Sequence, residues 1–242
     1  MKGDRALRPE RGAVGDKLGK VCTTIAAKTS EEMGRKATAA FALGTDLVEF
    51  RADILEEPRS VTAEGLRRFA RKAIVTVRRK EEGGSFKGSE AERLDLISEL
   101  SGLRPLYLDV ELSTAVENPD WYWKLRSGSR KIVSWHDFVG TPALSVLKRA
   151  RAGASAVGDV AKIVTTAKKT EDNRRVLRLY EEHPEALIAF CMGEAGTASR
   201  LASLQLGSPV TYASLPNEPV APGQLSVTTV VGLKTLWERR GC

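Results

Sequence analysis

Residues 159–165 read DVAKIVT, and this short stretch predicts a buried β-strand that carries a lysine. Its β-branched and apolar residues follow a Gly158-Asp159 turn signal, as is typical of a strand. Side chains alternate across a strand, so Lys162 shares one face with Val160 and Val164. Burial on such a face disfavours a charged ammonium and favours a neutral, nucleophilic amine. The alternative is an edge lysine whose ammonium reaches solvent, and the rest of the chain has to decide between the two.

The composition is that of an ordinary globular protein. Of 242 residues, 42% are hydrophobic and 29% are charged, which is enough to bury a full core in one α/β domain or two small ones. No apolar run approaches the ~20 residues that span a bilayer, and residues 1–20 lack a signal-peptide core. Three scattered cysteines without a CxxC motif predict a reducing cytoplasm, no disulfide framework and no structural zinc.

A net charge of +7 suggests anionic ligands or nucleic acid. The basic residues are dispersed, however, and they are interleaved with acids on the predicted helices 62–71 and 170–182. No stripe of aromatic and basic residues accompanies them, so solvated helix faces explain these charges. We therefore expect a small-molecule partner rather than nucleic acid or a membrane.

Apolar runs alternate with amphipathic ones along the chain. The predicted strands are 21–25, 47–51, 73–78, 106–111, 131–136, 160–165, 187–192 and 209–213. The predicted helices are 30–43, 62–71, 89–100, 119–125, 142–152, 170–182 and 197–206, and 224–239 suits a strand or a terminal helix. This alternation over about 250 residues predicts a single-domain (β/α)₈ TIM barrel over 18–242, after a flexible leader at 1–17. A doubly wound sheet is the alternative, but no GxGxxG follows the first strand.

Five of the predicted strands carry polar side chains on one face, mostly near their carboxyl ends. These are Glu49, Arg51 and Asp53; Thr76 and Arg78; Tyr107, Asp109 and Glu111; Ser134 and His136; and Lys162. In a barrel this face points inward, and catalytic groups gather at its carboxyl end. A network of structural ion pairs is the alternative, since buried charges must be paired. His136 is the natural candidate for proton transfer near neutral pH.

Several motifs in this order resemble the type I 3-dehydroquinate dehydratase family of the shikimate pathway. They are E-x-R-x-D at 49–53, Arg78 with Glu82-Gly83-Gly84, D-x-E at 109–111, SWHDF at 134–138 with Thr141-Pro142, the lysine strand at 159–163, Ser199-Arg200-Leu201 and APGQ at 221–224. The resemblance spans about residues 21–236. Class I aldolases also carry a Schiff-base lysine on a barrel strand, but they lack this histidine, arginine and glutamine set.

The resemblance implies dehydration of 3-dehydroquinate to 3-dehydroshikimate without metal or cofactor, by a cytoplasmic enzyme that forms a homodimer. In the catalytic set it implies, Lys162 forms an imine with the ring ketone, His136 moves the protons, and Glu82 orients His136. The substrate-binding residues it implies are Arg200 for the carboxylate and Thr24, Glu49, Arg51, Arg78 and Gln224 for the ring hydroxyls. The chain has Val220 where a serine is frequent in the family, and Thr24 where a serine is common.

Two other functions stay open from the residues alone: an aldolase acting on another ketone, and a basic, non-enzymatic anion-binding barrel. A last expectation concerns residues 214–224, which hold three prolines and almost no apolar pattern. We expect no anchored packing there and, from the resemblance, a lid that carries Gln224 over the substrate. A rigid proline-rich connector is the alternative.

Overall fold

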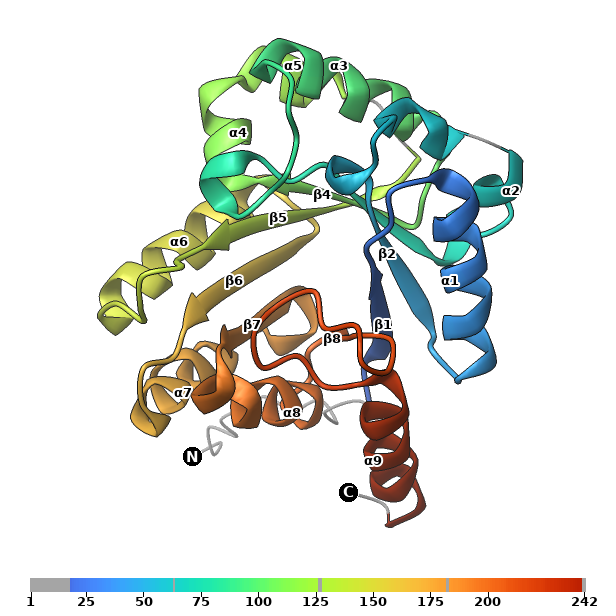
Figure 1. The fold of residues 1–242 in the computed structure, drawn as a ribbon. Helices are drawn as coiled ribbons and strands as arrows, with labels where there is room; N and C mark the ends of the chain where they lie inside the picture. The colour runs from blue at the N-terminus through green and yellow to red at the C-terminus, as the bar shows by residue number, and fades with distance from the viewer. Residues whose placement is uncertain (1–17, 63, 126–127, 182, 241–242) are drawn as a thin grey trace, which may run out of the picture.

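The computed structural model describes residues 18–62, 64–125, 128–181 and 183–240, and eight parallel strands form its centre. They are β1 (Lys20–Ile25), β2 (Leu47–Arg51), β3 (Ala73–Thr76), β4 (Tyr107–Glu111), β5 (Arg130–His136), β6 (Val160–Thr166), β7 (Leu187–Met192) and β8 (Val210–Ala213). Each strand from β1 to β6 pairs with the next one along the chain, and β1 also pairs with β8. The sheet therefore curls around on itself, with helices outside it (Figure 1). The predicted (β/α)₈ barrel is confirmed.

The barrel is closed except at one seam. Within the described residues the ladder ends at β7 on one side and at β8 on the other. The rings of Phe190 and Tyr212 lie 6.2 Å apart across this seam. Above them the loop that follows β8, orange to red in Figure 1, docks on the end of β7, where the Gly193 amide donates to the Pro222 carbonyl over 3.0 Å. Aromatic packing and a loop thus take the place of the last strand pairing.

Helices follow the strands around the outside of the barrel. They are α1 (Ser30–Ala42), α2 (Glu64–Arg67), α3 (Glu90–Ser101), α4 (Leu112–Glu117), α5 (Pro119–Lys124), α6 (Leu144–Val157), α7 (Thr170–Leu177), α8 (Thr197–Gln205) and α9 (Val227–Arg240). Local signals explain several starts: Thr29 accepts a hydrogen bond from the Glu32 amide, and Ser89 and Glu92 form a capping box.

The structure differs from the predicted elements in three places. The single helix expected over 62–71 is wrong, because the described residues of this range form only the short α2 and 3₁₀ turns. Helix α4 was not expected, since its six residues are too few to show a period. The ambiguous segment 224–239 is a helix from Val227 onward, because Val227 and Val230 pack against Val21 of β1.

Two apolar clusters flank the sheet. The larger one lies between the strands and the outer helices, and Trp135 packs against it. The other one fills the barrel interior with one to three residues from each strand. The expected leader at 1–17 lies outside the described residues. Among the residues that are described, no helix is long and apolar enough to cross a membrane.

Candidate active site

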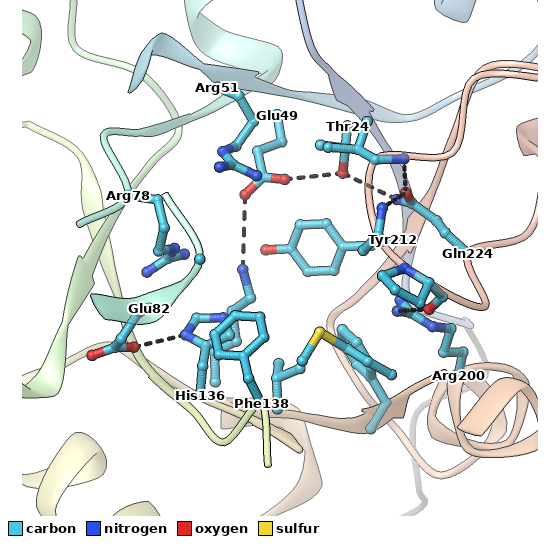
Figure 2. Close-up of a pocket in the computed structure, with 18 residues that line it drawn as sticks. Thr24, Glu49, Arg51, Arg78, Glu82, His136, Phe138, Arg200, Tyr212 and Gln224 are labelled. Atoms are coloured by element: carbon cyan, nitrogen blue, oxygen red, sulfur yellow. Dashed lines mark hydrogen bonds and ion pairs between the residues drawn. The ribbon is translucent and has the colours of Figure 1, made fainter. Parts of the chain in front are cut away.

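A pocket lies at the carboxyl ends of the strands, inside the barrel (Figure 2). All nine residues that the sequence singled out line it: Thr24, Glu49, Arg51, Arg78, Glu82, His136, Lys162, Arg200 and Gln224. They come from the four strands β1, β2, β5 and β6, from the loops after β3 and β8, and from helix α8, so the polar faces predicted for separate strands meet in one space. The structure places these side chains together, while their chemical roles stay predictions.

Lys162 lies at the centre of β6, with 5% of its surface exposed. Its Nζ donates to Asp109 Oδ2 over 2.8 Å and lies 3.8 Å from Glu49 Oε1. The Tyr212 ring covers another side, with its centroid 4.3 Å from Nζ. The sequence predicted a neutral amine between valines, and it missed the two carboxylates that β4 and β2 place beside Nζ.

His136 at the end of β5 is held by a carboxylate. Its Nδ1 lies 2.8 Å from Glu82 Oε2, and the other oxygen of Glu82 accepts from the Ser113 hydroxyl over 3.0 Å. Burial, together with the nearby Arg78 and Lys162 charges, lowers the pKa of His136 well below its usual value. Burial also raises the pKa of Glu82 to about 7. The imidazole is therefore neutral near pH 7, with its Nε2 left for a substrate.

The loops around His136 are fitted closely to it. The Phe138 ring stacks on the imidazole with centroids 5.9 Å apart. Gly83, next to Glu82, has a φ of 76°, and a Cβ there would lie 2.5 Å from the Phe138 ring. Only glycine combines this left-handed backbone with that contact. The Gly-Gly of the Arg78…Glu82-Gly83-Gly84 motif thus positions Glu82 against His136.

Glu49 and Arg51 form the wall on β2. Glu49 accepts hydrogen bonds from the hydroxyls of Thr24 and Thr76, both over 2.9 Å. Arg51 forks onto Asp53 through Nε and Nη2, over 2.8 and 2.7 Å. These bonds fix both side chains before any ligand enters, so their remaining polar atoms can face a substrate in a set geometry.

Arg78 is engaged by three neighbours. Its Nη1 donates to Glu111 over 2.9 Å and to the Ser134 hydroxyl over 2.7 Å, while Nη2 donates to Asp109 over 2.9 Å. The sequence predicted a residue that binds ring hydroxyls. In the structure Arg78 is first of all the counter-ion of two buried carboxylates, and it lowers the pKa of Asp109 together with Lys162.

Arg200 on α8 is the cation of the pocket that lacks an acidic partner among the described residues. It is 3% exposed, its Nη2 reaches the Pro222 carbonyl over 3.3 Å, and its Nε has no hydrogen-bond partner. The Phe190 ring lies 4.4 Å below the guanidinium. Burial lowers the pKa of Arg200 to about 10. A buried cation of this kind is stabilised by an anion that enters the pocket.

The loop after β8 is anchored, contrary to the expectation from its sequence. The Gln224 carboxamide donates to Thr24 Oγ1 over 3.2 Å and to the Ala213 carbonyl over 2.9 Å, and it accepts from the amides of Val220 and Ala221. Hydrogen bonds from one amide side chain replace the apolar contacts that the pattern lacks. Gly223 has a φ of 71°, and a Cβ there would lie 2.1 Å from the Gly193 carbonyl. Glycine therefore permits this docking.

Three residues of the site were not chosen from the sequence. Asp109 was noted on a polar face but not assigned a role, although it contacts the lysine directly. Tyr212 lines the pocket with a buried hydroxyl that finds no hydrogen-bond partner among the residues described, and Phe138 stacks on His136. The alternation of side chains along β4 placed Asp109 on the inward face. No sequence pattern distinguishes an inward tyrosine on β8 from an aromatic residue of the core. The described residues contain no group of three His, Cys, Asp or Glu side chains that could hold a metal ion.

Comparisons with known proteins agree with this geometry. The model of the type I 3-dehydroquinase family matches residues 21–236. The 3-dehydroquinate dehydratase of Pyrococcus abyssi is 38% identical over 222 residues, which cover 91% of this chain and 100% of that protein. The enzyme of the same name from Thermococcus gammatolerans is 43% identical over 208 residues, with 85% and 95% covered.

Solved structures give the same result. The crystal structure of 3-dehydroquinate dehydratase from Geobacillus kaustophilus superposes with a TM-score of 0.80 at 28% identity, covering 91% of each chain. The match of the family model extends from β1 into α9 and thus takes in every strand of the barrel. By its sequence, its fold and the position of its pocket, the chain belongs to the type I 3-dehydroquinase family.

Proposed function

We propose that this chain is a 3-dehydroquinate dehydratase that converts 3-dehydroquinate to 3-dehydroshikimate and water through an imine on Lys162. One observation carries the proposal. A buried amine, a neutral histidine and a guanidinium with no acidic partner in the described part of the chain line the same pocket, in a chain of this family. Together they supply a nucleophile, a base and an anion site, which are the three groups that the reaction needs.

Lys162 would attack the ring ketone, and loss of one water molecule would leave an iminium. The iminium nitrogen carries its positive charge where the ammonium had it. Asp109, 2.8 Å from Nζ, and Glu49, 3.8 Å from it, would therefore stabilise the intermediate as they stabilise the resting lysine. The iminium withdraws electrons from the neighbouring carbon and makes its C–H bond acidic.

His136 would take that proton on Nε2, because Nδ1 is already held by Glu82. The resulting enamine expels the ring hydroxyl on the next carbon, and the imidazolium gives its proton to that leaving group, so a second water is formed. Hydrolysis of the conjugated imine uses one water and frees Lys162. The net change is the loss of one water from the substrate. A base whose pKa lies below neutrality is unprotonated at the start, as this sequence requires.

Binding would be shared between two walls of the pocket. Arg200 would pair with the substrate carboxylate through its guanidinium, whose Nε has no hydrogen-bond partner among the described residues. The Tyr212 hydroxyl is a second buried polar atom without a partner, and a ring hydroxyl could accept from it. Thr24, Glu49, Arg51, Arg78 and Gln224 would contact the remaining hydroxyls, with Val220 in place of the serine that is frequent in the family.

The direct test is to add 3-dehydroquinate and follow the absorbance of the conjugated enone product. We expect steady turnover by the wild type, none by Lys162→Met, and no effect of a chelator, since we expect no metal or cofactor to take part. A purified, folded wild type that produces no enone would contradict the proposal. Cleavage of another ketone without an enone would instead indicate an aldolase.

We also propose a homodimer in the cytoplasm, as the resemblance implies. Sedimentation equilibrium of the purified chain tests the first point, with a mass of about twice 26.3 kDa expected. Fractionation of cells that make the chain tests the second. A monomer at micromolar concentration would contradict the dimer.

A further inference from the structure

Arg93 is a buried arginine on the outer helix α3, and its surroundings are unusual for that place. It is 1% exposed, although α3 lies outside the barrel and arginines are rarely buried unless paired. Its Nε and Nη2 fork onto Glu90 over 2.8 Å each, and Nη2 also donates to the Thr114 hydroxyl over 2.6 Å. Its Nη1 donates to the Val77 carbonyl over 2.6 Å and to Glu111 over 2.9 Å. All five N–H groups are thus used.

Glu111 links this arginine to the pocket. Its Oε2 accepts from Arg93, and its Oε1 accepts from Arg78 over 2.9 Å. Arg78 in turn donates to one oxygen of Asp109, whose other oxygen accepts from Lys162. The charges alternate along this row without a gap: Glu90, Arg93, Glu111, Arg78, Asp109 and Lys162. The row begins at the protein surface, where the Glu90 side chain is 38% exposed, and it ends at the reactive amine.

We propose that Arg93 is a positioning residue for the reaction: through Glu111 it holds Arg78 and Asp109 in place and so fixes the Lys162 amine. This proposal rests on the proposed dehydratase function. Neither Arg93 nor Glu111 lines the pocket, so neither can act by touching the substrate. Their effect would be carried by the two groups between them and the lysine.

The physical reason lies in the sharing of Arg78. Its guanidinium serves two buried carboxylates, Asp109 and Glu111, and Arg93 supplies Glu111 with a second cation. Without Arg93, Arg78 would be the one cation among the described residues still paired with Glu111, whose other hydrogen bonds come from the Arg79 amide over 3.1 Å and the Thr114 hydroxyl over 3.3 Å. Glu111 would then draw Arg78 away from Asp109, since a buried charge without a full partner is costly. Asp109 would then lose a bond to the oxygen opposite its contact with Lys162. A shift of the amine by a fraction of an ångström is enough to slow attack on a ketone.

The experiment measures kcat and KM for Arg93→Met with 3-dehydroquinate. We expect kcat to fall roughly 10- to 100-fold, the scale of a displaced catalytic group, while KM changes less than twofold. The rate at which borohydride traps the substrate on Lys162 in a single turnover should fall with kcat. Arg93→Lys keeps one charge near Glu111 but loses the fork to Glu90, so its kcat should lie between the two.

A double-mutant cycle with Glu111→Gln tests the route. If Arg93 acts through Glu111, the double variant is no slower than the slower single variant. It also removes both charges of the buried Arg93–Glu111 pair, and the Glu90 carboxylate that loses Arg93 is 38% exposed and can be solvated. The double variant therefore keeps the test available if Arg93→Met alone does not fold. The matched control is Lys234→Met, which removes another ion pair, 2.9 Å to Asp46, near the amino end of β2. It should lower the melting temperature and leave kcat unchanged.

Three results would overturn the proposal. The first is an Arg93→Met enzyme with wild-type kcat per folded molecule. The second is a loss of kcat in Lys234→Met equal to that in Arg93→Met, which would indicate a general effect of destabilisation. The third is multiplicative losses in the cycle, which would indicate independent roles. A wild type without any turnover would overturn the proposed function and this inference with it, whereas an active wild type beside an unaffected Arg93→Met would overturn the inference alone.

Discussion

The two halves of the barrel interior are built from the same strands and differ in almost every side chain. At the amino ends, the inward residues form an apolar layer, called the lower layer here; the inward residues at the carboxyl ends form the upper layer. The lower layer consists of Cys22, Leu47, Ile74, Tyr107, Ile132, Val160, Ile188 and Val210. Two residues further along, the same faces carry Glu49, Thr76, Asp109, Ser134 and Lys162, and the next step adds Arg78, Glu111 and His136. The change from apolar to charged happens within one period of the strand.

The comparison separates stability from chemistry. Each fully buried aliphatic side chain of the lower layer contributes about 1.5–3 kcal/mol to the free energy of folding. The upper layer buries charges, and buried ion pairs add little net stability, because desolvation offsets their attraction. The lower layer therefore stabilises the barrel. This stability offsets the cost of removing the charged groups of the upper layer from water. β7 and β8 stay apolar to the top, with Phe190, Met192 and Tyr212, and form the wall that faces these charges.

Loss of the proton-transfer group should have the largest effect on turnover among the non-lysine variants. His136→Ala removes the imidazole from the upper layer and leaves the lower one intact. We expect kcat to fall by roughly 10²–10⁴ with the substrate still bound. Steady-state kinetics and substrate titration measure the two effects. A kcat near that of the wild type would show that His136 does not move the proton.

The Glu82–His136 pair should control the pH dependence. Burial raises the pKa of Glu82 to about 7. Above this pH the carboxylate accepts a hydrogen bond from Nδ1–H, so Nε2 is free to act as a base. Below it, a protonated Glu82 donates to Nδ1 and leaves the proton on Nε2, and activity is lost. We therefore expect kcat to rise with pH through about 7 in the wild type. In Glu82→Gln this rise of kcat with pH should be absent, and kcat should be lower than in the wild type. The same rise in that variant would refute the assignment of the pH dependence to Glu82.

The loop that carries Gln224 should have a smaller effect. Gln224→Ala removes its bonds to Thr24, Ala213, Val220 and Ala221, while the docking of Pro222 on Gly193 stays. We expect kcat/KM to fall less than in Glu82→Gln and the amides of 214–224 to exchange faster with solvent. Hydrogen-exchange mass spectrometry measures this, and substrate should slow the exchange in the wild type. If neither activity nor exchange changes in the variant, the loop is a rigid connector.

Substitutions in the lower layer should reduce stability without changing kcat. Ile132→Val removes one methylene from a fully buried side chain on β5, two residues before Ser134. It should cost about 0.5–1.5 kcal/mol of unfolding free energy and leave kcat unchanged. Urea unfolding and kinetics on the same sample give both numbers. A large loss of kcat would show that the two layers are not separable in this way.

The alternation of side chains between the two faces of each strand explains why most of the fold and much of the site could be predicted from the sequence. The pattern that places Lys162 inward also places Asp109, Ser134 and His136 inward, and the structure has them so. The lysine's partner was missed because pairing depends on the register between β4, β5 and β6, which no single strand encodes. The charged surroundings of Lys162 therefore could not be read from its two valines.

Other parts depend on tertiary contacts that the pattern does not contain. Helix α9 forms from Val- and Thr-rich residues that favour a strand locally, because Val227 and Val230 are buried against β1. The 214–224 loop reads as unanchored, yet one glutamine side chain makes four hydrogen bonds that hold it. Arg93 was assigned no role from the sequence, because its burial depends on the position of Glu111 on β4.

The most direct test of the central claim is to trap the imine on Lys162. Borohydride added with 3-dehydroquinate should reduce the intermediate, and peptide mass analysis should find the adduct on Lys162. Lys131 is the matched control, because burial lowers the pKa of its amine and yet it lies outside the pocket. Lys131→Met should keep the adduct, and Lys162→Met should lose it. Turnover by the wild type with no adduct, or with the adduct on another lysine, would contradict the account.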